Sequence, residues 1–296
     1  MKENEVMEMV KPPKVHWFKD FKKDIKTAGM ALWMYVGIQI CSGMSIAAAL
    51  YMFGENVFML VMTIASALAV ILFLKSRYRI DVKEDLKGLY VKEIVQGLSW
   101  MLLISLVWGI ISILINAVLN VLGLSNLDQG IYFGHHFFGN VCLFVTVVFA
   151  APIAEELVFR GLIFKNFARY HVGFAMVFSS FCFACMHMNV VQGIPTFFMG
   201  LVLSYFYWKT KSLKTCIGIH MLNNAIAMLS MVVNIDMVVL VLEGLGIYYL
   251  IQSWSGLKTF AKNQKFTSEY MSYVTQSPIF QGFFLFFIGM AVISLF

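Results

Sequence analysis

The stretch AAPIAEELVFRGLIF, Ala150 to Phe164, places Glu155, Glu156 and Arg160 inside an apolar run. An ionised side chain at the centre of a bilayer costs roughly 2.5–3.5 kcal/mol on insertion scales. Such side chains therefore need partners or take part in chemistry. Glu156 and Arg160 are four residues apart with the acid first, the favourable order for an ion pair on one helix face. Glu155 lies about 100° away around the helix. It is either a spare structural acid or available for chemistry.

The composition is that of a polytopic membrane protein. Of the 296 residues, 60% are hydrophobic and 13% charged, whereas soluble domains average roughly 45–50% and 25%. The prediction is an all-α transmembrane helical bundle of about eight or nine spans, because each apolar run approaches the length needed to cross a bilayer. The runs cover about 28–53, 57–74, 94–122, 137–164, 172–188, 196–208, 215–233, 237–251 and 277–296.

The basic residues indicate the orientation of these spans. Of the 22 Lys and Arg residues, 21 fall in the N-terminal arm and in the segments 75–92, 165–171, 209–214 and 252–276. The remaining one is Arg160. Since cytoplasmic segments carry the excess of Lys and Arg, this bias predicts a cytoplasmic N-terminus. Residues 1–27 are expected to form a basic cytoplasmic arm, weakly amphipathic over Val15–Ile25 and lying on the inner leaflet. Residues 28–296 are expected to form a single membrane domain.

The net charge of +6 is explained by these topology signals and does not suggest nucleic acid as a partner. Other polar or reactive residues in the chain are interpreted structurally. Glu243 has no motif around it, and His135 and His136 belong to a predicted outer loop. The cysteines all lie in apolar segments and are interpreted as small buried hydrophobic residues: Cys41, Cys142, Cys182, Cys185 and Cys216.

Two later segments offer partners for the glutamates. FACMHMN contains Phe183 and His187, and IGIHMLNNA contains His220 and Asn224, each pair being four residues apart and so on one helix face. A single histidine in an apolar helix is more often an interhelical hydrogen-bonding group than a catalyst. Here the histidines, the asparagine and the two glutamates are distributed over three spans. This combination favours a functional site.

The segments EELVFR, FACMH and HMLNN match the EExxxR, FxxxH and HxxxN motifs of the CPBP family (CAAX prenyl endopeptidase and bacteriocin-processing, or Abi, family), over about residues 137–233. The resemblance implies an intramembrane glutamic endopeptidase. It further implies that Glu155 and His187 activate a water and that His220 and Asn224 donate to the oxyanion. Glu156 and Arg160 then form the ion pair that holds Glu155 in place. These six residues are the predicted catalytic set.

The resemblance also implies the surroundings and partners of the chain: the lipid bilayer, a membrane-associated peptide or protein substrate, and a bacterial cytoplasmic membrane. No cofactor is expected. Zinc stays open because two histidines and a glutamate could bind it, although the sequence has no HExxH motif. Two other functions also stay open: a non-proteolytic membrane partner, in bacteriocin immunity or sensor-kinase regulation, and a transporter. The sequence does not identify the substrate.

Overall fold

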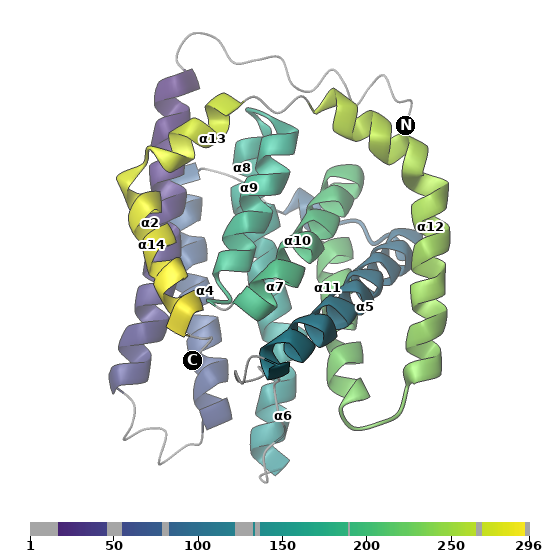
Figure 1. Ribbon diagram of the computed structural model, residues 1–296. Coiled ribbons are helices and arrows are strands. Elements are labelled where there is room, and N and C mark those ends of the chain that lie inside the picture. The colour runs from purple at the N-terminus through teal and green to yellow at the C-terminus, as the bar shows by residue number, and fades with distance from the viewer. Residues whose placement is uncertain are drawn as a thin grey trace.

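The computed structural model describes residues 17–45, 55–78, 83–121, 133, 137–188, 190–264 and 268–293. These residues fold into helices, and no strand occurs among them, so the predicted all-α class is confirmed. In chain order the helices are α2 (Trp17–Ser45), α4 (Glu55–Tyr78), η1 (Glu84–Leu86), α5 (Val91–Val121), α6 (Phe137–Val145), η2 (Thr146–Ala150), α7 (Ala151–Glu156), η3 (Leu157–Phe164), α8 (Lys165–Ala168), α9 (Val172–Cys185), α10 (Val190–Thr210), α11 (Leu213–Ser230), α12 (Asp236–Asn263), α13 (Ser268–Thr275) and α14 (Pro278–Ile293) (Figure 1).

Among the described residues, four helical segments are long and apolar enough to cross a membrane: Asn56–Tyr78, Val91–Val121, Phe137–Ala168 and Asp236–Asn263. Two shorter apolar helices cover Val172–Cys185 and Pro278–Met290. The number of spans and the cytoplasmic N-terminus stay predictions. The first 16 residues of the expected basic arm lie outside the described residues.

The first helix begins earlier than the predicted span. It starts at Trp17, and its amphipathic beginning turns the apolar side toward the protein: Phe21 and Ile25 are buried in the core. The Phe21 ring packs edge-on against Tyr170. The Tyr170 hydroxyl donates to Asp24 over 2.8 Å. Burial and this hydrogen bond to Asp24 raise the pKa of Tyr170, which keeps the hydroxyl protonated as a donor. The expected surface arm is therefore part of α2 from Trp17 onward.

The segments predicted to be cytoplasmic lie together at one end of the bundle. This end carries α8, α13 and the last turns of α12, at the top of Figure 1. The segments are joined by ion pairs and by a hydrogen bond from a backbone amide: Arg169 with Asp24, Lys165 with Asp85, Lys209 with Glu93, and the Gly173 N–H with the Gln264 side chain. This gathering agrees with a common side of the membrane for all of them.

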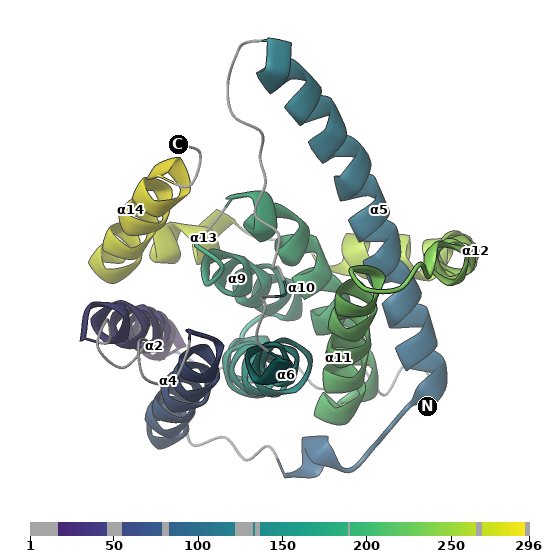
Figure 2. The ribbon, with the colours of Figure 1, turned by 90° about the horizontal axis from the view of Figure 1, so that it is seen from below.

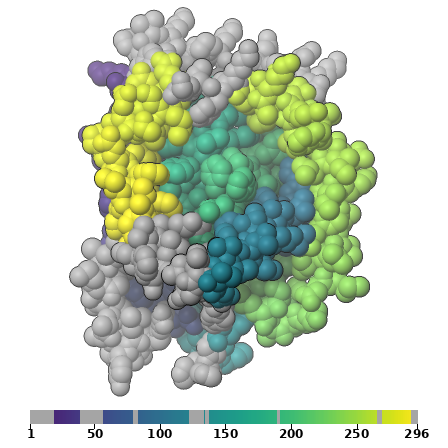
Figure 3. All heavy atoms as spheres, in the orientation of Figure 1, coloured from purple at the N-terminus to yellow at the C-terminus, as the bar shows by residue number. Residues whose placement is uncertain are grey.

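Several helices present apolar side chains outward, α5 and α12 among them. Ile113 and Leu114 on α5, and Val241 and Ile251 on α12, are all more than half exposed. Figure 3 shows α5 and α12 forming the outer surface on one face of the molecule. A helix that is apolar all round, including its outer face, is typical of a membrane span. This surface fits contact with lipid.

The motif-bearing helix Phe137–Ala168 lies in the middle of the bundle. Figure 2 shows α6 between α4 and α11, with α9 and α10 beside it. The end of this helix that is predicted to lie at the cytoplasmic side is fixed by an aromatic cluster, in which Phe167 packs on Phe174 and Phe178. Elsewhere in the bundle, α5 and α12 approach each other so closely that a Cβ on Gly246 would lie 2.5 Å from the Ser99 carbonyl oxygen. The motif-bearing helix itself packs against α4, α9 and α11 (Figure 2).

Candidate active site

The helix that carries the glutamates departs from α-helical geometry on both sides of them. The π-helical segments η2 (Thr146–Ala150) and η3 (Leu157–Phe164) flank the short α7 (Ala151–Glu156). Pro152, in the first turn of α7, has no N–H to give to the preceding turn. π-helical turns are wider than α-helical ones, and they occur frequently at functional sites. They change which way the following side chains point.

Both wide segments are attached to neighbouring helices through their carbonyl groups. The Asn224 amide nitrogen, on α11, donates to the Val147 carbonyl over 2.9 Å. The Ser179 hydroxyl, on α9, donates to the Phe159 carbonyl over 2.8 Å. These side chains therefore fix η2 and η3 on either side of Glu155 and Glu156.

The ion pair expected from the spacing of Glu156 and Arg160 is present and fully buried. The Arg160 Nη1 atom donates to Glu156 Oε1 over 3.0 Å, and both side chains are 0% exposed. Arg160 also donates from Nη2 to the Gly200 carbonyl over 3.1 Å, and its guanidinium lies 4.6 Å from the centre of the Phe183 ring. A buried charge pair needs such additional contacts to offset its lost hydration.

His220 lies between the two glutamates. Its Nδ1 atom is 3.0 Å from Glu156 Oε1, and its Nε2 atom is 3.7 Å from Glu155 Oε2. A carboxylate accepts hydrogen bonds, so the contact with Glu156 assigns the proton to Nδ1. The Nε2 atom is then the one that faces Glu155. The ion pair and the histidine thus form one connected network that ends at Glu155.

His187 joins this network through Phe183. It follows α9, and its Nδ1 atom lies 3.2 Å from the Phe183 carbonyl oxygen. The Phe183 ring stands nearly perpendicular to both imidazoles, with centroid distances of 5.3 Å to His187 and 5.7 Å to His220. Among the described residues, no hydrogen bond or ion pair links His187 directly to Glu155.

Asn224 is fixed by two contacts. Besides donating to Val147, it accepts a hydrogen bond at Oδ1 from the Asn223 amide over 3.3 Å. An asparagine amide carries two N–H donors. One of them remains for another acceptor. Asn223, Ser179 and Gly200 were not identified from the sequence, because their roles come from contacts between helices that no local spacing encodes.

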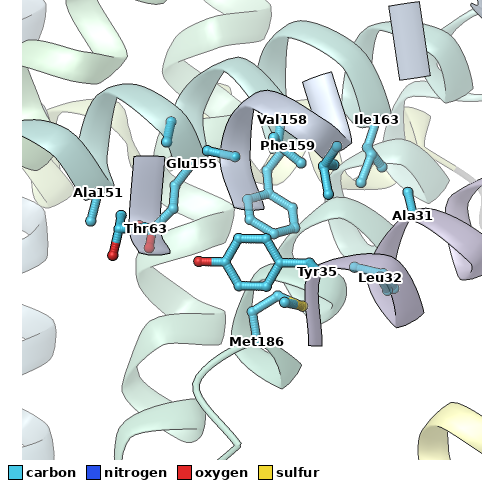
Figure 4. Close-up of a pocket in the computed structure, with 13 residues that line it drawn as sticks. Ala31, Leu32, Tyr35, Thr63, Ala151, Glu155, Val158, Phe159, Ile163 and Met186 are labelled. Carbon is cyan, nitrogen blue, oxygen red and sulfur yellow. The ribbon is translucent and has the colours of Figure 1, made fainter. Parts of the chain in front are cut away.

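A narrow crevice opens beside Glu155, between α2, α4 and α7. About 20 Å³ of it is open to a water-sized sphere. Its walls are largely apolar, and Tyr35 and Thr63 contribute hydroxyl groups (Figure 4). Met186, the neighbour of His187, also lines it. Of the six residues in the predicted catalytic set, Glu155 is the one that lines this crevice. No motif surrounds Tyr35 or Thr63, and sequence reasoning missed both.

In the part of the chain that the structure describes, the predicted residues are not arranged as a zinc site. A zinc enzyme needs three protein ligands from His, Cys, Asp or Glu. Across the described ranges, no group of three or more such side chains is arranged to hold a metal ion. Glu156 already binds both Arg160 and His220. The described cysteines are free and buried, whereas the side chain of Cys41 and the histidines at 135 and 136 lie outside the described residues.

Comparison with known families agrees with the motif resemblance. Residues 137–226 match the family model described as type II CAAX prenyl endopeptidase Rce1-like. The match covers EELVFR, FACMH and most of the last motif helix, and it confirms the resemblance to this family of membrane endopeptidases. Comparison with curated proteins and with solved structures gave no match.

Proposed function

We propose that this chain, whose residues 137–226 carry the Rce1-like domain, is an intramembrane endopeptidase that uses Glu155 as general base. One observation supports the proposal above all: Glu155 stands beside a histidine whose orientation is fixed. The Nε2 atom of His220 lies 3.7 Å from Glu155 Oε2, while its Nδ1 atom is bound by Glu156. A structural salt bridge between Glu156 and Arg160 would need neither Glu155 nor His220.

The proposed reaction is hydrolysis of a peptide bond. Glu155 takes a proton from a water, whose oxygen forms a bond to the peptide carbonyl carbon. The carbon–nitrogen bond then breaks, and the proton on Glu155 passes to the leaving nitrogen. A positioned acid–base group of this kind typically contributes a factor of about 10² to 10⁴ in rate. His187 keeps the role given by the family resemblance, as a second group at the water.

Asn224 and His220 are proposed to stabilise the oxyanion, with His220 as an imidazolium that donates from Nε2 while its Nδ1 donates to Glu156. They lie four residues apart on α11 and face the same helix as Glu155. The second N–H of the Asn224 amide is the donor that remains after its bond to Val147. Loss of one oxyanion donor typically costs about 2.7–4 kcal/mol in the barrier. The fixed amide orientation therefore suits this task.

The substrate is proposed to be a membrane-associated peptide or protein. The site lies in a helix apolar enough to cross a membrane, and the crevice at Glu155 is walled largely by apolar side chains. A hydrophobic segment can reach such a site from the lipid. We further propose that the protein lies in a bacterial cytoplasmic membrane, with its N-terminus in the cytoplasm.

The proposal is tested by mass spectrometry of peptides released from membranes. Cells producing the wild type are compared with cells producing Glu155→Ala. Glu243→Ala serves as the matched control, because Glu243 is another buried acid but lies on α12, outside the predicted set. We expect peptides that appear with the wild type and Glu243→Ala and are absent with Glu155→Ala. Identical peptide sets in all three strains would contradict proteolysis and favour a non-proteolytic partner.

A further inference from the structure

A second and larger hollow lies between α5, α10 and α12, with a contribution from α9. The labels of Figure 1 locate these helices in the bundle, and the groove between them has a volume of about 460 Å³. Apart from Lys258, the side chains that line it are aliphatic, aromatic or methionine. Ligand cavities in proteins typically measure about 300–1,000 Å³ and are lined mainly by such side chains. The groove is therefore large enough for a ligand with a long apolar part.

The groove is separate from the candidate active site. None of the six residues in the predicted catalytic set lines it. Helix α10 stands between the two, because its Gly200 carbonyl accepts a hydrogen bond from Arg160, whereas the next two residues, Leu201 and Val202, line the groove. The groove is therefore not the place in which a peptide bond would meet Glu155, and its ligand is a molecule other than the peptide that is cleaved.

Two walls of the groove belong to helices that are long and apolar enough to cross a membrane, Val91–Val121 and Asp236–Asn263. Beside the groove, Trp254 and Ile251 on α12 are more than half exposed, as expected for side chains that face lipid. A bilayer lipid can therefore enter the groove sideways. The apolar walls favour a hydrocarbon chain over a polar ligand, because burying apolar surface stabilises a complex and burying an unpaired polar group destabilises it.

Lys258 gives the groove a positive charge. Within the described part of the chain, Lys165 and Lys209 pair with carboxylates, whereas no carboxylate lies within ion-pair distance of Lys258. Its ammonium stands 5.7 Å from the centre of the Trp254 ring. No acidic side chain lines the groove, so nothing in its lining would bind the ammonium group of a zwitterionic headgroup. The charge therefore favours a ligand whose polar end is negative.

The position of Lys258 along α12 fits the level of lipid headgroups. From residue 236, where the helix begins, to residue 258 the chain advances 22 residues, which is about 33 Å at 1.5 Å per residue. The hydrocarbon core of a bilayer is roughly 30 Å thick, so Lys258 reaches one interface when Asp236 lies at the other. We propose that the groove binds a phospholipid with an anionic headgroup, whose acyl chain lies between α5, α10 and α12 and whose phosphate contacts Lys258. This site does not depend on the proposed endopeptidase function.

Native mass spectrometry of the full chain tests the lipid site. The purified protein in detergent is mixed with equal amounts of phosphatidylglycerol and phosphatidylethanolamine that carry the same acyl chains. We expect the wild type to retain one phosphatidylglycerol in preference to phosphatidylethanolamine. Lys258→Gln should weaken phosphatidylglycerol binding about fivefold, as loss of one basic residue at an anionic lipid surface does, and Lys258→Arg should restore it. Lys262→Gln is the matched control, because Lys262 lies one turn further along α12 and does not line the groove. Its binding should stay close to the wild-type value.

A second pair of variants tests the groove itself. Val202→Trp places a large ring in the groove and should reduce the binding of both lipids. Val107→Trp makes the same change on α5 at a position that is 50% exposed and outside the groove, and it should bind like the wild type. Unfolding in detergent shows which variants fold, and the exposed Lys258 position keeps the test valid if Val202→Trp does not.

Three results would overturn the proposal. The first is equal retention of the two lipids by the wild type, and the second is unchanged phosphatidylglycerol binding in Lys258→Gln or in folded Val202→Trp. The third is an apolar transmembrane peptide that binds in place of both lipids, which would assign the groove to a protein segment. None of these measurements uses peptide cleavage, so a failure of the proposed function leaves the lipid site untouched, and the reverse also holds.

Discussion

The Nδ1 atom of His220 lies 3.0 Å from Glu156 Oε1, the same oxygen that accepts a hydrogen bond from Arg160. One carboxylate oxygen thus holds both the arginine and the histidine. The histidine in turn presents Nε2 to Glu155. The buried ion pair therefore does more than neutralise two charges. It fixes the ring of a residue in the predicted catalytic set, so stability and activity should respond together when the pair is broken.

Breaking the buried pair should destabilise the protein strongly. Arg160→Gln leaves Glu156 as a buried charge without its partner, which typically costs about 3–5 kcal/mol. Glu156→Gln does the same to Arg160. Thermal or denaturant unfolding in detergent measures both. Lys87→Ala is the control, because the pair of Lys87 with Glu84 is exposed to solvent, and such pairs contribute at most about 1 kcal/mol. Equal stability of all three variants would contradict a structural role for the pair.

Glu155→Gln should separate activity from stability. Glu155 is partly exposed to the crevice and does not share the ion pair with Arg160. We expect near-normal unfolding and a loss of cleavage, because glutamine cannot accept the proton of the water. Released peptides and unfolding curves are measured on the same preparation. If Glu155→Gln were less stable than Glu156→Gln and Arg160→Gln, the division between a catalytic and a structural glutamate would be wrong.

A methyl group at Gly200 should disturb the site from a distance. Its carbonyl accepts a hydrogen bond from Arg160, and a Cβ there would lie 2.9 Å from the Ser180 Cβ. Gly200→Ala must therefore push α10 away from α9 and lengthen the contact with Arg160. Gly244→Ala is the control, since nothing lies near a Cβ at that position of α12. It should be neutral or stabilise by up to about 1 kcal/mol through helix propensity. Unfolding in detergent should show the Gly200 variant alone as destabilised.

The sequence predicts contacts within a helix better than contacts between helices. Glu156 and Arg160 are four apart on one helix, so their pairing depends only on helical geometry. The placement of His220 between two glutamates depends on how α11 packs on α7, which no spacing within either segment encodes. The same holds for Thr63 and Tyr35. No local spacing predicts the π-helical turns around α7, although Pro152 removes a backbone donor at that point.

Helix ends were also set by packing rather than by hydropathy. The first helix begins at Trp17 instead of near 28, because Phe21 and Ile25 bury themselves against the aromatic cluster. α12 runs from Asp236 to Asn263, well beyond the predicted apolar run that ends near 251. Its last turns are polar, so a prediction based on hydropathy does not include them in the helix. For these two helices, composition therefore predicted the apolar part and not the full length.

The orientation in the membrane can be tested by labelling single cysteines. The excess of basic residues predicts that Lys83 and Lys262 face the cytoplasm, while Asn56 and Asp128 face outward. Asp128 lies outside the described residues. In a cysteine-free background, a membrane-impermeant reagent added to intact cells should label cysteine at 56 and 128 and spare 83 and 262 until the cells are opened. Labelling at 83 in intact cells would reverse the orientation and the span count together.

The role of Asn224 provides the strictest test of the catalytic assignment, because the residue also has a structural contact. Its amide donates to Val147 and so holds η2 in place. Asn224→Ala removes that bond together with the donor proposed for the oxyanion. If the residue stabilises the oxyanion, kcat per folded molecule should fall about 100- to 1,000-fold with little change in KM. If it is structural alone, unfolding in detergent should shift while kcat per folded molecule stays near the wild-type value. Ser179→Ala is the matched control. It removes the comparable bond to the Phe159 carbonyl and should change stability with at most a small effect on kcat.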